Sequence, residues 1–324
     1  MSSALSQFVF VMLLLYSSAG PASLNALAAR SNPPAAPTDP VALDTLPAAA
    51  PGIHFVHVAT PDNTSGDTTF LHFPLITGDP GAVLIVTQNW NPGGAPSGVY
   101  NNQKVGVSYV SLQGYWGIYN ESGGDMPVGA AFNVFIPATG PNAFLHTTTA
   151  NNVLSNWTTL DHALTNNNPS ALLFTTHKFE FGPKGYEFHD HSLGVWYNAS
   201  VGKWAIFNQD FISMDQELDF NIWVASAGAV TFVHTASAAN SAGNSTYLDH
   251  PLTNGRPNAI ATVTQNWNPG GIGGTYNDKV VGVWYDPTQK KWAVFNQDGS
   301  AMPVGAAFNI LLDQAKMYLP LVLQ

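Results

Sequence analysis

Two copies of one short segment combine residue types that proteins use to recognise sugars. The sequence Gln-Asn-Trp-Asn-Pro-Gly-Gly occurs at residues 88–94 and again at residues 265–271. An indole ring offers a flat face to the apolar side of a sugar, and neighbouring amides can bond its hydroxyl groups. The alternative is a core tryptophan at a strand end, followed by a plain turn, which is the more common role of large aromatic residues. The candidate ligand-binding residues of these segments are Trp90, Asn91, Trp267 and Asn268.

A second repeated segment is rich in oxygen ligands. It reads Asn-Gln-Asp-Gly at residues 296–299 and Asn-Gln-Asp at residues 208–210. Such oxygens can coordinate calcium, but residues 120–123 shift the carboxylate by one position, and no stretch has the acidic spacing of an EF-hand. Asp-Gly is an ordinary turn signal, so we interpret the segment as a turn and predict no metal site. Asn120 and Asn296 complete the candidate ligand-binding residues.

Three histidines recur at one position of a repeated strand, namely His57, His146 and His234. A catalytic or metal-binding role would need partners that converge on each of them, and no such set recurs in all three places. We therefore interpret them as histidines at the edge of a core with satisfied hydrogen bonds. His189 and His191 lie on one face of a strand and could bind a metal, but this pattern occurs only once.

The sequence lacks the motifs of known catalytic machinery. A G-x-S-x-G elbow, an H-E-x-x-H helix and a P-loop are all absent. No acidic residue occupies one aligned position in all repeats, whereas a repeated catalytic unit is expected to keep its acid. We predict no catalytic residues, no cofactor and no enzymatic activity, with a secreted hydrolase as the last alternative.

The sequence segments that must position these candidate residues occur in three copies along the chain. Each copy opens with Phe-x-His and closes with Phe-Asn, and the openings lie 89 and 88 residues apart. The predicted organisation is a signal peptide (1–28), a Pro/Ala-rich linker (29–52), module 1 (53–138), a divergent module 2 (142–226), module 3 (230–313) and a tail (314–324).

Each copy predicts about six short strands, because runs of Val, Ile, Thr and aromatic residues alternate with Asn, Gly, Pro and Asp. The clearest hairpin spans residues 280–296, with a turn at Asp-Pro-Thr. The predicted fold class is all-β, with three tandem small antiparallel β-sandwich or barrel modules. Six strands already supply two packed layers, so we expect independent beads and not one pseudo-threefold body. Residues 316–324 are expected to add an edge strand.

Composition limits the possible partners. The formal net charge is −10, so a basic surface for nucleic acid or anionic membranes is missing. There is no cysteine, which excludes disulfides and thiolate chemistry. The apolar run at residues 8–16 is too short to span a bilayer, and Ala-Leu-Ala at residues 26–28 predicts signal cleavage. We expect a secreted protein without a membrane segment after cleavage.

Several phrases between residues 232 and 309 resemble a bacterial, often extracellular, tandem-repeat domain family of unknown function. They are FVHTAS, TYLDHPLTNG, TQNWNPGG, GVWYD, KWAVFNQDG and MPVGAAFN. The resemblance covers residues 55–312 and implies module boundaries and export. It implies no activity and no site residue.

Two functional hypotheses follow. The first is an extracellular binding or adhesion protein whose three modules bind a glycan or cell-surface polymer with avidity. The second is a structural surface or matrix protein that assembles through the exposed strand edges of its repeats. The sequence leaves the oligomeric state open.

Overall fold

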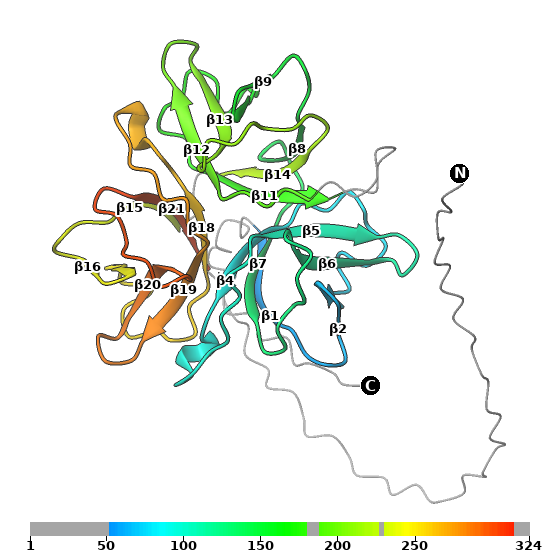
Figure 1. Cartoon of the computed structure of the whole chain (residues 1–324), viewed down its shortest axis with the longest axis vertical. Coiled ribbons are helices and arrows are strands. Elements are labelled where there is room, and N and C mark those ends of the chain that lie inside the picture. Colours follow the sequence, from blue (N-terminus) through cyan, green and yellow to red (C-terminus); the bar gives the residue numbers. More distant parts are fainter. Residues whose placement is uncertain (1–51, 180–187, 227–229, 314–324) are drawn as a thin grey trace, which may run out of the picture. The chain divides into compact units, whose positions relative to one another are not determined.

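The computed structural model describes residues 52–179, 188–226 and 230–313, and these residues fold almost entirely into β-strands (Figure 1). The all-β fold class with three tandem sandwich modules is confirmed. The predicted signal peptide, the predicted linker up to residue 51 and the predicted edge strand of the tail lie outside the described residues.

Each module contains seven strands. Module 1 has β1 (Gly52–Val58), β2 (Thr64–Ser65), β3 (Thr68–Leu71), β4 (Ile85–Asn89), β5 (Val105–Val110), β6 (Tyr115–Asn120) and β7 (Ala131–Pro137). Module 2 has β8 (Ala143–Thr147), β9 (Val153–Leu154), β10 (Trp157–Thr159), β11 (Leu173–Phe179), β12 (Leu193–Asn198), β13 (Lys203–Asn208) and β14 (Asp219–Val224). Module 3 has β15 (Val230–Thr235), β16 (Ser241–Ala242), β17 (Ser245–Tyr247), β18 (Ala261–Gln265), β19 (Val281–Asp286), β20 (Lys291–Asn296) and β21 (Ala307–Leu312).

The prediction from the third copy is close to the observed strands. All six expected strands are present, and the structure adds the two-residue strand β16. The hairpin expected at residues 280–296 is confirmed, because β19 pairs with β20 in antiparallel register from Val281↔Asn296 to Asp286↔Lys291. Short 3-10 turns, η1 (Pro92–Gly94) and η2 (Pro269–Gly271), follow β4 and β18.

Two antiparallel layers form each module. One layer has three strands, as in β1-β7-β4, and the other has four, as in β2-β3-β6-β5. Modules 2 and 3 repeat this pattern. A buried tryptophan lies in each core, and its indole N–H donates to a loop carbonyl of the same module at 2.8–2.9 Å. These tryptophans are Trp116, Trp204 and Trp292.

Parallel strand contacts join every module to the other two. In module 1, β4 pairs with β19 of module 3, and β5 pairs with β11 of module 2. The third junction is a parallel bridge between Val195 of β12 and Asn266, the residue after β18. The three-stranded layer of one module thus meets the four-stranded layer of another, and the three junctions close a ring (Figure 1).

The expectation of independent beads is wrong. Six or seven strands do supply two layers, but each layer leaves an open edge that a neighbouring module pairs. All three modules also contribute to a shared apolar core, which contains Ile85, Phe135, Phe174, Trp223 and Leu311. The three modules therefore form one body.

Candidate functional site

The repeated histidines are bonded within their own modules. Nε2 of His57, His146 and His234 lies 2.7–2.8 Å from the hydroxyl oxygen of a threonine in the other layer of the same module. Burial lowers the pKa of each imidazole to about 4, so all three are neutral at pH 7. The interpretation as core-edge histidines with satisfied hydrogen bonds is confirmed.

Asn91 and Asn268 connect neighbouring modules. The backbone N–H of Tyr285 donates to Oδ1 of Asn91, and Nδ2 of Asn91 donates to the Tyr285 carbonyl at 2.9 Å. Asn268 makes the same two bonds with the backbone of Tyr197. Both side chains are almost fully buried, with 1% and 3% exposure. These amides act as clamps on a strand of another module, and the clamp bonds occupy the groups that a ligand would need.

Asn120 and Asn296 hold turns. Nδ2 of Asn120 donates to the carbonyls of residues 124 and 125, and Nδ2 of Asn296 donates to those of residues 300 and 301. Neither side chain is exposed. The segment at residues 296–299 folds as a turn, in which the Ser300 N–H donates to Oδ1 of Asp298 at 2.9 Å.

Trp90 belongs to an aromatic row that spans the junction of modules 1 and 3. Tyr100, Trp90, Trp284 and Tyr247 follow one another with ring centroids 5.5, 6.2 and 6.3 Å apart. Trp90 and Trp284 are partly exposed, and Tyr100 is 54% exposed. Gly98 passes so close to Trp90 that any Cβ there would clash with its carbonyl and ring. We call these four residues the first aromatic row.

Trp267 belongs to a matching row at the junction of modules 2 and 3. Tyr276, Trp267, Trp196 and Trp157 lie with ring centroids 5.4, 6.3 and 5.7 Å apart. Tyr276 is 42% exposed, and Gly274 lies against Trp267 as its counterpart does in module 1. These four residues form the second aromatic row. Sequence reasoning found Trp90 and Trp267 but missed their partners, which come from other parts of the chain.

The junction of modules 1 and 2 is built differently. Its strand register pairs Phe179 with Ser108. The residues at both of these positions are tryptophans at the other two junctions. A buried acid lies here instead. Nδ1 of His177 is 2.7 Å from Oε1 of Glu121, and the backbone N–H of His189 donates to Oε2 at 2.8 Å. The Tyr119 hydroxyl donates to Oε1 at 3.0 Å.

The electrostatics of this acid cluster, Glu121 with Tyr119, His177 and His189, are set by burial and mutual contact. Burial alone would raise the pKa of Glu121, but His177 and the His189 N–H hold it below its ordinary value. Burial, reinforced by Glu121, raises the pKa of Tyr119 well above its usual range. Burial lowers the pKa of His189 to about 4. The four side chains form one buried hydrogen-bonded cluster with no exposed acid or base.

The metal-binding possibility for His189 and His191 gains no support from the geometry. Nε2 of His189 donates to Oδ1 of Asn208 at 2.7 Å, and Nδ1 of His191 lies 2.6 Å from Oδ2 of Asp210. Across the described ranges, no three His, Cys, Asp or Glu side chains converge as a metal site.

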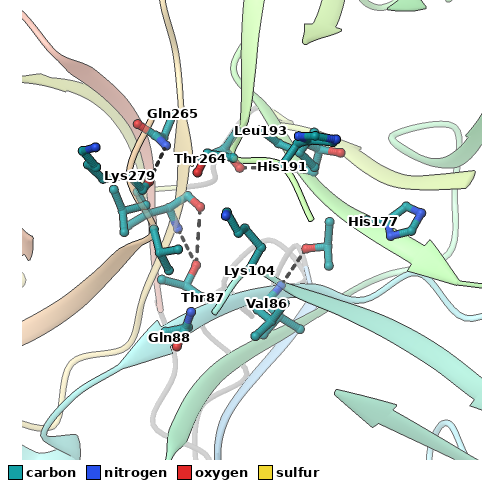
Figure 2. A pocket seen from close by; sticks show the side chains of 17 residues that line it. Val86, Thr87, Gln88, Lys104, His177, His191, Leu193, Thr264, Gln265 and Lys279 are labelled. Carbon is teal, nitrogen blue, oxygen red and sulfur yellow. Dashed lines mark hydrogen bonds between the residues drawn. The ribbon is translucent and has the colours of Figure 1, made fainter. Parts of the chain in front are cut away.

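A pocket of about 110 Å³ with both polar and apolar walls lies where the three modules meet (Figure 2). Strands β4, β11 and β18 each contribute a threonine to its wall, and each hydroxyl oxygen accepts a backbone N–H from another module at 2.9–3.2 Å. These residues are Thr87, Thr176 and Thr264. We call this cavity the three-module pocket. Sequence reasoning missed it, because it exists only once the ring closes.

Comparison with known proteins identifies a repeated domain. A family described as Domain of unknown function (DUF7452) matches the chain three times, at residues 45–113, 106–224 and 194–312. No curated protein matches the chain, and no solved structure does. Within the described residues, no helix is both long and apolar enough to cross a bilayer.

Proposed function

The chain belongs to the DUF7452 family, and from the geometry of its junctions we propose that it is an extracellular carbohydrate-binding protein. The observation behind this proposal is the pair of matching aromatic rows at two of the three junctions. Export rests on the apolar run and the Ala-Leu-Ala pattern near the N-terminus.

The rows have the properties of a sugar platform. Each contains four neighbouring rings whose successive planes are inclined by 40–88°, so an apolar sugar face can stack on one ring while the edge of the next ring contacts it. The exposed tyrosine at one end adds a hydroxyl that can donate to or accept from a sugar hydroxyl. The clamp residues Asn91 and Asn268 position the row tryptophans and are not themselves ligands in this proposal.

Two rows on one closed body provide two binding sites at fixed separation. Binding at one site raises the effective concentration of a polymeric glycan at the other, so the pair binds more tightly than either alone. The proposed valency is two and not three, because the junction of modules 1 and 2 has Ser108 and Phe179 where the rows have tryptophans.

The test removes the exposed end of each row. In the variant with both Tyr100→Ala and Tyr276→Ala, glycan binding on an array falls by about fivefold per site, since an aromatic contact contributes about 1 kcal/mol and about 1.4 kcal/mol is a factor of ten. Either single variant retains one site and binds more weakly than the wild type. Tyr115→Ala, which lies outside both rows, binds normally. Wild-type binding that persists in the double variant refutes the proposal.

The second candidate function is self-assembly into a surface layer. In the described part of the chain, β1, β8 and β15 each lie at the end of a sheet and have five to seven residues. Such edges can add a strand from another copy. Light scattering after size-exclusion chromatography separates the two functions, because an assembling protein grows with concentration and a monomeric binder does not.

A further inference from the structure

The wall of the three-module pocket has an unusual composition for this protein. The chain has 20 acidic residues against 10 Lys and Arg, yet none of the described residues that line the pocket is acidic. Its wall includes two lysines and two histidines: Lys104, Lys279, His177 and His191. Each of these four groups lies 2.6–3.3 Å from a carboxylate outside the lining, and the carboxylates belong in the same order to Asp190, Asp278, Glu121 and Asp210.

Lys104 is the central basic group. In Figure 2 its side chain extends into the middle of the lining residues, whereas Lys279 lies toward the rim. Its Nζ is 3.3 Å from Oδ1 of Asp190, and about a third of the side chain is exposed. An ammonium group has three N–H donors, and this single contact uses one of them, so two can bond a ligand.

Other parts of the wall supply hydroxyl groups, beside six apolar side chains of valine and leucine. The three wall threonines accept backbone N–H groups. Thr87 donates its own proton to the Val263 carbonyl at 3.4 Å, whereas Thr176 and Thr264 keep theirs to donate. The hydroxyl of Thr175, which also lines the pocket, is buried without a hydrogen-bond partner in the described part of the chain. A buried polar group of this kind is usually satisfied by a water or a ligand.

The volume of the pocket limits the size of the ligand. A cavity of about 110 Å³ is far smaller than the sites of ordinary metabolites, which are several hundred Å³. A lysine ammonium with free N–H donors, hydroxyl donors and a small volume match a tetrahedral or planar oxyanion. We propose that the three-module pocket binds a small oxyanion, a sulfate, phosphate or carboxylate group, with Lys104 as its principal partner. This site is independent of the aromatic rows.

The experiment uses the full chain with sodium sulfate and sodium phosphate as probes, and sodium chloride at equal ionic strength as the reference. Calorimetric titration is expected to show saturable binding of one anion per chain. Lys104→Gln weakens that binding at least tenfold, and Lys104→Arg, which keeps the charge, restores most of it. Lys203→Gln is the matched control, because it removes an equal charge from an exposed ion pair with Asp161 outside the pocket.

The outcomes are distinct. If Lys104→Gln and Lys203→Gln weaken anion binding equally, the proposed site is refuted, because binding then depends only on the total charge of the protein. Absence of saturable binding in the folded wild type also overturns it. Competition by a sulfated monosaccharide identifies an anionic group on a glycan as the source, and competition by inorganic anions alone identifies a free ion. Folding of Lys104→Gln is checked by its unfolding transition.

Discussion

Asparagine side chains bridge every pair of modules. Asn133, Asn221 and Asn309 end the repeated Phe-Asn motif, and each donates through Nδ2 to a backbone carbonyl of another module at 2.8–3.1 Å. All three are buried. Buried amides need partners, and here the partners lie across a junction. The recurrence of these residues in the sequence thus reflects ring closure.

The clamp formed by Asn91 gives a stability prediction. Asn91→Ala leaves the Tyr285 N–H and carbonyl unpaired in a buried junction, which is expected to lower the free energy of unfolding by about 1–3 kcal/mol. Chemical denaturation at pH 7 measures this loss. The exposed Asn151→Ala changes stability by less than about 0.5 kcal/mol and serves as the control. A stable Asn91→Ala that loses sugar binding would restore Asn91 as a ligand residue.

At the scale of elements, the residue that directly follows β6, β13 or β20 makes a different kind of contact at different junctions. The position of Glu121 is occupied by Gln209 and Gln297 in the other modules, and each accepts a backbone N–H across its junction. Only the junction of modules 1 and 2 replaces these neutral contacts with an acid and two histidines. That junction should therefore respond to acid more strongly than the others.

This difference predicts a pH dependence. The unfolded state protonates a histidine near pH 6.5, whereas His189 in the fold does so only at about 4, so stability falls as the pH falls between these values. Glu121, with its lowered pKa, adds stability above its unfolded value that is lost in more acidic solution. The variant Glu121→Gln/His177→Gln/His189→Asn copies the neutral junctions and should show a shallower loss of stability from pH 7 to 4.

Urea unfolding at several pH values measures how steeply the free energy of unfolding changes with pH in the wild type and in the variant. Some slope remains in the variant, because His57, His146 and His234 also have pKa values of about 4. An unchanged slope in a folded variant would show that the acid cluster does not govern the response.

The sequence was most informative for local structure and least informative for contacts between modules. Runs of β-formers and turn residues located the strands and the 280–296 hairpin, because those signals are local. The ring was missed because the pairing of β4 with β19 leaves no local pattern. The amides of Asn91 and Asn268 were interpreted as ligand groups, since a buried clamp and an exposed binding residue look alike in a sequence.

At the scale of the whole molecule, the three modules share strands and a core. Each junction covers strand edges that would be open in an isolated module, and the shared core would expose Phe135, Phe174 and Trp223 on separation. The stability of one module therefore depends on its neighbours.

The ring predicts a single cooperative unfolding transition for the full chain. In scanning calorimetry, the calorimetric and van't Hoff enthalpies should agree for the whole body. A fragment of residues 53–138 alone should unfold at least 10 °C lower than the full chain or fail to fold, because it lacks partners for β4 and β5. Three separate transitions, or a fragment as stable as the full chain, would contradict this expectation.

Closure between the first and last modules also sets an order of events during synthesis. Asn91 and its partner Tyr285 are 194 residues apart in the chain. Contacts of such long range form slowly, and β4 has no parallel neighbour until β19 has been made. A nascent chain thus exposes the unpaired edge of β4, which is prone to aggregation, until most of the chain has been synthesised. That interval is when binding of a chaperone to this strand edge would protect the chain most.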